Sequence, residues 1–227
     1  MPENEKLYTN QAFRTKDIFE QEKLIVRQIL GKRIITTFDN ENYYTDQTTY
    51  VINKKDNNFN LLFLLSVMNS KLMYYYFKNT FSDNKVTFPK VKRSQILKFP
   101  IKKTENQQPF IEKADKMLSL NKKLQTEKDN FSKTLQEEKG IEKLSKKLQN
   151  FQNLEYEEFK KELRKKKIKI SLGNENNEWR EYFNTAKQKI NGLQNQINQT
   201  DTEIDKMVYE LYELTAEEIE IVENSVK

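Results

Sequence analysis

The feature that most constrains the fold is a regular apolar seam near the end of the chain. Side chains there recur in alternating steps of three and four residues: Ile190, Leu193, Ile197, Thr200, Ile204, Met207 and Leu211. This spacing corresponds to the a and d positions of heptads, which bring the side chains onto one face of a helix. Because such a face must be covered, the sequence predicts a long helix that packs against another helix.

A second, less regular seam runs from residue 110 to residue 135, with Phe110, Ala114, Met117, Asn121, Leu124, Phe131 and Leu135 as its members. The segment between the two seams is long enough to reverse the chain, so we predict an antiparallel, coiled-coil-like hairpin within one chain. An intermolecular coiled coil is the alternative. The expected arms are residues 105–135 and 187–213. Residues 136–186 form an elaborated tip, in which 155–167 is predicted to be helical.

The first 104 residues have a different pattern. Runs rich in β-branched side chains predict strands at 23–30, 33–38, 43–44 and 48–52, separated by polar turns. Apolar residues at helical spacing predict a buried helix over 61–78. A strand with an edge proline over 86–91 and a short helix capped by Ser94 complete the predicted elements.

The predicted fold class is therefore α+β. A small mixed domain occupies residues 1–104, and the helical hairpin occupies residues 105–227.

Charge is concentrated in the first of these domains. Residues 1–104 contain eighteen Lys/Arg and ten Asp/Glu, a net charge of +8 against +6 for the whole chain. Within them, residues 69–103 hold nine Lys/Arg and one acidic residue, Asp83, with aromatic residues interspersed. Basic side chains beside aromatics are typical of nucleic-acid-binding surfaces, because Lys and Arg neutralise phosphates. A solvated lysine-rich surface is the alternative.

The residue types present exclude several kinds of chemistry. The chain has no histidine and no cysteine, which excludes zinc sites and Ser-His or Cys-His nucleophilic sites. There is no glycine-rich phosphate loop and no Asn-Pro-Pro-Tyr run. Carboxylate-only chemistry with Mg²⁺ is not excluded by residue type, but no Pro-Asp…Asp/Glu-x-Lys run of a nuclease is evident. We therefore predict no catalytic and no metal-binding residue in this chain. No secretion signal or apolar span is evident, so we expect a cytoplasmic protein without a membrane partner.

Five runs, in order along the chain, resemble a known family. They are FEQEKLIVR (19–27), LLSVMNSKLM (64–73), FPKV with ILKFPI (88–91 and 96–101), QQPFI (107–111) and VYELYELTAEEI (208–219). Together they resemble the TaqI-type C-terminal specificity domain of adenine-specific DNA methyltransferases and type IIG restriction–modification enzymes. The resemblance extends over nearly the whole chain except residues 136–186.

The resemblance implies a target recognition domain for double-stranded DNA that has no catalytic site of its own. It also implies a methyltransferase or endonuclease catalytic domain, in cis or in trans. S-adenosylmethionine, with or without Mg²⁺, is expected on that separate domain. Two other functions stay open: a coiled-coil protein-interaction module and an RNA-binding module.

Candidate DNA-binding residues fall into two groups. Base-reading candidates are Arg27, Lys32, Arg33, Asn42, Tyr44 and Gln47, on or near the predicted strands. Phosphate-contacting candidates are Lys85, Lys90, Lys92 and Arg93. A further run, residues 164–169, carries five basic side chains in six positions. It is either a second phosphate contact or, the interpretation we favour from sequence, a solvated helix face.

Overall fold

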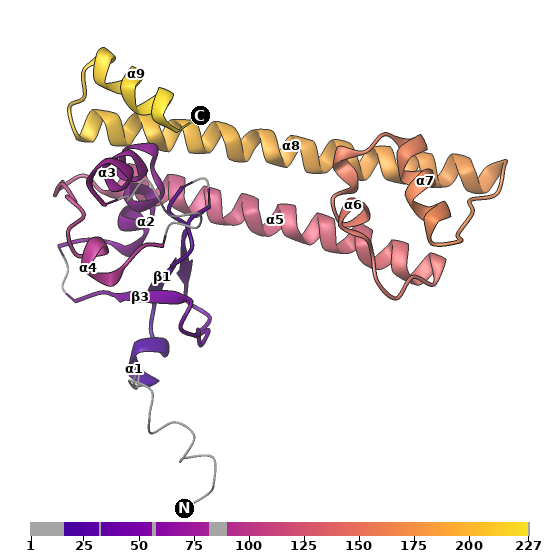
Figure 1. The fold of residues 1–227 in the computed structure, drawn as a ribbon, viewed down its shortest axis with the longest axis horizontal. Coiled ribbons are helices and arrows are strands. Elements are labelled where there is room, and N and C mark those ends of the chain that lie inside the picture. Colours follow the sequence, from indigo (N-terminus) through magenta and orange to yellow (C-terminus); the bar gives the residue numbers. More distant parts are fainter. Residues whose placement is uncertain (1–15, 32, 56–57, 82–89, 227) are drawn as a thin grey trace, which may run out of the picture. The chain divides into compact units, whose positions relative to one another are not determined.

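A computed structural model describes residues 16–31, 33–55, 58–81 and 90–226 (Figure 1). The described residues form two compact units. One unit comprises the residues up to Ala114 together with those from Glu203 onward, and the other comprises Asp115–Thr202. The predicted domain boundary between residues 104 and 105 stays a prediction about which part folds independently.

The first unit contains a three-stranded antiparallel sheet in the order β2-β1-β3. The strands are β1 (Lys23–Arg27), β2 (Thr36–Asp39) and β3 (Thr49–Asn53). In the central strand β1, Leu24 and Val26 are fully buried whereas Arg27 is exposed. Residues 43–44, predicted as strand, lie instead in the loop between β2 and β3. That loop carries the chain from one end of the sheet to the other.

The helices of the first unit surround an apolar core. They are α1 (Lys16–Phe19), α2 (Leu61–Asn69), α3 (Lys71–Phe81), α4 (Arg93–Ile96) and α9 (Ala216–Ser225). The same unit contains the start of α5 (Gln108–Lys139), up to Ala114, and the end of α8 (Asn174–Leu211), from Glu203 onward. Phe63, on α2, is fully buried and packs edge-on against Phe110, with ring centroids 5.2 Å apart. Burial of one such side chain contributes about 1.5–3 kcal/mol.

Two local predictions need correction. The helix expected over 61–78 is two helices, because Ser70 has extended backbone angles (φ −68°, ψ 156°) and interrupts it. The short helix before Pro100 begins at Arg93 after an N-cap at Lys92, not at Ser94. The strand expected over 86–91 lies mostly outside the described residues, although Lys90 forms an isolated antiparallel bridge with Ile29.

A buried ion pair joins β1 to the end of β2. The Lys23 and Asp39 side chains pair with each other and are 0% and 4% exposed. Lys23 Nζ also donates to the Phe19 carbonyl (2.6 Å), and Asp39 accepts from the backbone N–H groups of Glu41 and Tyr43. Burial alone would raise the pKa of Asp39, but the hydrogen bonds from Lys23 and the backbone leave it lowered. The pair therefore ties three chain segments together at one end of the sheet.

In the second unit the helices α5 (Gln108–Lys139) and α8 (Asn174–Leu211) run antiparallel. Three contacts show this direction: Glu127 with Lys189 (2.7 Å), Phe131 with Tyr182 (ring centroids 5.3 Å apart) and Lys139 with Glu175 (2.5 Å). From one contact to the next, the residue number rises on α5 and falls on α8. The predicted long helical hairpin within one chain is thus confirmed. The second arm begins at Asn174, whereas the sequence pattern placed its start near residue 187.

The chain between the arms folds onto them. It contains α6 (Lys146–Gln149), the 3-10 helix η2 (Phe151–Asn153) and α7 (Tyr156–Lys165), which accounts for the helix predicted over 155–167. Their apolar side chains join α5 and α8 in an aromatic core, in which Phe131 stacks on Phe151 at 3.5 Å and Phe159 packs against Phe183 at 5.0 Å. The end of the hairpin is therefore a small helical domain with its own core.

We expect Lys23→Met to lower the free energy of unfolding by about 3–5 kcal/mol, because it leaves the Asp39 carboxylate buried without its cation. Adding Asp39→Asn should recover part of this loss. Urea unfolding followed by circular dichroism measures both effects. Lys54→Met, at an exposed position after β3, is the control. A Lys23→Met variant as stable as the Lys54→Met variant would contradict the role of the pair.

The second unit should lose stability in acid through Glu175. Hydrogen bonds from Lys139 Nζ and from Ser171 lower the pKa of Glu175 from 4.5 to about 2. Because folding lowers this pKa, the ionised carboxylate stabilises the fold above about pH 4.5, and the stabilisation is lost as the pH falls toward about 2. Glu175→Gln should therefore show a smaller loss of thermal stability between about pH 6 and about pH 3 than the parent. The exposed Glu178→Gln variant is the control, and parallel pH profiles for Glu175→Gln and the parent would contradict the assignment.

Candidate DNA-binding surface

Four exposed cations of the first unit lie at the end of β1 or on the segment attached to it: Arg27, Lys90, Lys92 and Arg93. Arg27 is the last residue of this strand and is exposed on the side opposite to Val26. Just beyond it, Ile29 bridges to Lys90, and the Val91 N–H donates to the Gln28 carbonyl at 2.8 Å. These backbone contacts attach the segment that starts at Lys90 to the strand end, although more than sixty positions separate them in sequence.

Three of the predicted phosphate-contacting residues lie on this attached segment. Lys90, Lys92 and Arg93 are all exposed, whereas Val91 between them is buried and anchors the segment in the core. The Lys92 N–H donates to the Gln95 side chain at 2.7 Å, which fixes the start of α4. The segment therefore presents its cations from an ordered backbone, beside Arg27.

Gln47 lies at the same end of the sheet. The Gln28 side chain donates to the Gln47 carbonyl at 2.5 Å, and the Gln28 N–H donates to the Thr48 carbonyl at 2.9 Å. These contacts hold the loop before β3 against the end of β1 and leave Gln47 exposed. Five of the ten predicted residues thus come together: Arg27, Gln47, Lys90, Lys92 and Arg93.

Asn42 and Tyr44 lie at the opposite end of β1. Tyr44 stacks on Phe19 at 4.8 Å and donates to Glu20 at 2.6 Å, a hydrogen bond that raises the pKa of Tyr44. Phe19 and Glu20 come just before the first residue of β1. At the usual rise of a strand, the first and last residues of β1 are about 13 Å apart. Asn42 has a left-handed backbone (φ 59°), which accounts for an asparagine in this turn. The structure does not bring these two residues together with the Arg27 group.

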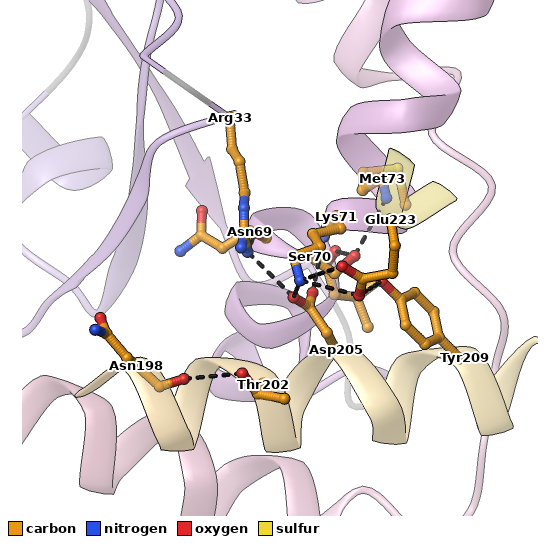
Figure 2. A network of polar contacts seen from close by, with 11 residues as sticks. Arg33, Asn69, Ser70, Lys71, Met73, Asn198, Thr202, Asp205, Tyr209 and Glu223 are labelled. Carbon is orange, nitrogen blue, oxygen red and sulfur yellow. Dashed lines mark hydrogen bonds and ion pairs between the residues drawn. The ribbon is translucent and has the colours of Figure 1, made fainter. Parts of the chain in front are cut away.

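Arg33 points into the unit. Its guanidinium lies 3.4 Å from Asp205 Oδ2 and 3.5 Å from the Asn69 carbonyl, as Figure 2 shows. Asp205 is 1% exposed, so this arginine is engaged with a buried carboxylate. Lys32 and Lys85, the other two predicted residues, lie outside the described residues.

The carboxylate that holds Arg33 belongs to a polar network that the sequence patterns did not predict. Asp205, on α8, accepts the Lys71 N–H at 2.8 Å, and Lys71 Nζ donates to Glu223 on α9 at 2.7 Å (Figure 2). Tyr209 donates to Glu223 at 2.8 Å. Burial and this hydrogen bond raise the pKa of Tyr209. The only signal in the sequence was an aspartate immediately after an a/d position of an apolar seam.

The sequence run around residues 69 and 70 also has a structural explanation. The Asn69 side chain accepts the Thr36 N–H at 2.8 Å and donates to the Thr36 carbonyl at 2.9 Å. It thus satisfies outward-facing backbone groups of the edge strand β2. Ser70 Oγ accepts the Met73 N–H at 3.2 Å and so caps α3.

The described residues offer neither a metal site nor a membrane span. In that part of the chain no group of three or more Asp or Glu side chains could hold a metal ion, and no helix is long and apolar enough to cross a membrane.

Comparison with known protein families divides the chain in two. Residues 3–101 match the TaqI-like C-terminal specificity domain, and residues 103–208 match a domain of unknown function (DUF8810). No curated protein and no solved structure matches the chain. The runs at 107–111 and 208–219 lie outside the first match, so the resemblance is narrower than the nearly complete coverage expected from the sequence. Residues 3–101, somewhat less than half of the chain, are therefore similar to the TaqI-like C-terminal specificity domain, a similarity that suggests a DNA-specificity function in restriction–modification enzymes.

Proposed function

We propose that the chain reads a short sequence of double-stranded DNA for the methyltransferase or endonuclease catalytic domain of a restriction–modification enzyme. The proposed DNA-binding surface consists of Arg27, Gln47, Lys90, Lys92 and Arg93, at the end of β1. The observation that carries the proposal is the bridge between Ile29 and Lys90. The bridge attaches the segment of the exposed residues Lys90, Lys92 and Arg93 to the end of β1, in the part of the chain that is similar to a specificity domain, and this supports a common surface with Arg27.

The two kinds of residue on this surface suit two tasks. Lys90, Lys92 and Arg93 lie close together in sequence on an anchored backbone, which suits contacts to successive phosphates that set the register of the duplex. Arg27 stands on the sheet itself, where its guanidinium has the fork geometry that pairs with guanine O6 and N7. Gln47 offers an amide that pairs with adenine in the same groove.

Methyl transfer or cleavage would be supplied by the catalytic domain, in cis or in trans. S-adenosylmethionine would bind on that domain, because this chain offers no glycine-rich loop that could hold it. Arg33, Asn42 and Tyr44 are left out of the proposed surface. Arg33 is engaged with Asp205, and Asn42 and Tyr44 lie at the other end of the sheet.

We predict that Lys90→Glu, Lys92→Glu and Arg93→Glu together weaken binding to every duplex by the same large factor, because phosphate contacts carry no sequence information. Neutralising one of the three should lower the slope of log K against log salt by about 0.9. Fluorescence anisotropy on specific and unrelated duplexes at several salt concentrations measures both effects.

The matched control is Lys16→Glu, Lys54→Glu and Lys55→Glu. These residues are equally exposed, but they flank the opposite end of β1, where Asn53 pairs with Lys23. Equal losses in the two triple variants would mean a general charge effect and would contradict the proposed surface.

A different outcome is predicted for Arg27→Ala. If Arg27 reads a base edge, its loss should relax the preference at one base pair at a cost of roughly 1–3 kcal/mol, with the other positions unchanged. Selection from randomised duplexes with parent and variant compares the preferences position by position. A loss of affinity with the base preference unchanged at every position would indicate that Arg27 contacts a phosphate instead of a base.

A further inference from the structure

The strongest concentration of charge in the second unit lies on α7 and the turn that follows it. Residues 160–169 contain seven basic side chains and one acidic one, Glu162. Five of the seven make no ion pair with any described residue and are exposed: Lys161, Arg164, Lys166, Lys167 and Lys169. We call these five the α7 cations.

The one acidic side chain of this stretch, Glu162, pairs with two lysines and leaves the α7 cations unpaired among the described residues. Its carboxylate is 10% exposed and lies 2.6 Å from Lys165 Nζ and 3.9 Å from Lys147 Nζ. Lys147 belongs to α6, so one buried carboxylate holds lysines from two elements. Lys143 and Lys146, also exposed, precede Lys147. Glu162 therefore brings cations of α6 and of the end of α7 close to each other.

Lys167 occupies a backbone position that glycine would fit better. Lys167 N–H donates to the Arg164 carbonyl and Ile168 N–H to the Leu163 carbonyl, which is the Schellman arrangement that ends a helix. Lys167 occupies its left-handed position, with φ 63°. Glycine is preferred there because a side chain strains the left-handed backbone. The chain thus keeps a lysine where glycine would be more stable.

The helix dipole accounts for only part of the pattern. Basic side chains in the last turn of a helix stabilise it, and Arg164 and Lys165 are in that position. The effect falls off within one turn, so it does not explain Lys166, Lys167 and Lys169. These three extend the charge beyond the end of the helix.

We propose that the α7 cations, with those of α6, form a second binding surface for the phosphate backbone of duplex DNA, separate from the specificity domain. The choice of duplex DNA rests on the proposed function, because DNA is then the polyanion that this chain meets. Duplex DNA also presents about one negative charge per 1.7 Å of helix axis, which a surface of unpaired cations neutralises with release of counterions. Such binding adds affinity without sequence preference.

The first test removes three α7 cations from the intact chain, with Arg164→Gln, Lys166→Gln and Lys169→Gln. We expect affinity to fall by the same factor for specific and unrelated duplexes, at least roughly tenfold at about 0.1 M salt. The salt slope should decrease by about 0.9 for each phosphate that the variant no longer neutralises. The control variant, Lys116→Gln, Lys122→Gln and Lys123→Gln, removes three exposed lysines of α5 in the same unit and should leave both quantities unchanged.

Lys167→Gly separates charge from folding. It removes one cation and relieves the left-handed strain, so the variant should unfold at a higher temperature and yet bind DNA more weakly than the parent. Weaker binding in a more stable protein cannot arise from misfolding. Unchanged binding in the Lys167→Gly variant and in the triple variant would overturn the proposal.

The outcomes also separate this inference from the proposed function. A chain without sequence preference, whose affinity and salt slope still fall in the triple variant, would refute the proposed function and support the second surface. A chain with sequence preference, whose affinity and salt slope are unchanged in the triple variant, would support the proposed function and refute the second surface. Loss of binding to single-stranded RNA or to anionic phosphatidylserine vesicles, with duplex affinity unaffected, would overturn duplex DNA as the ligand.

Discussion

Three consecutive residues where α2 ends hold the first unit together. Asn69 completes the hydrogen bonding of the edge strand β2, and Ser70 breaks the helix and caps α3. Lys71 then reaches Asp205 on α8 and Glu223 on α9. Because the buried Asp205 carboxylate needs compensating donors, these contacts connect the sheet and α3 to the C-terminal helices of the same unit. Removal of one partner would leave charges buried, which is more costly than removal of an exposed ion pair.

This junction has a consequence for the proposed DNA-binding surface. Arg33 follows the end of β1 by only a few residues, and its guanidinium is drawn toward Asp205. The exposed cations at the strand end are therefore Arg27 and, through the Ile29–Lys90 bridge, the segment of Lys90, Lys92 and Arg93. Folding thus divides these basic residues into Arg33, which pairs with a buried carboxylate, and those that stay exposed. In the second unit Glu162 makes the same division, since it pairs with Lys165 and Lys147 while the α7 cations stay exposed.

Much of the fold follows from local patterns. The heptad spacing from Ile190 to Leu211 predicted the antiparallel hairpin, and the β-branched runs predicted β1, β2 and β3 in outline. The sequence could not show that Ser70 interrupts a helix, because the apolar spacing continues through it. It also could not separate Arg33 from Arg27. Both are arginines near the first strand, and only the distant Asp205 distinguishes them. The bridge to Lys90 depends on a contact between segments far apart in sequence, which no local pattern encodes.

We propose that this chain selects a DNA sequence by itself. The most direct measurement incubates the intact chain, without any catalytic partner, with a pool of randomised duplexes at moderate salt and sequences the bound fraction. We expect enrichment of one short motif, and loss of that enrichment in the variant in which Lys90, Lys92 and Arg93 are reversed to glutamate. A bound fraction with the same composition as the input pool would contradict it.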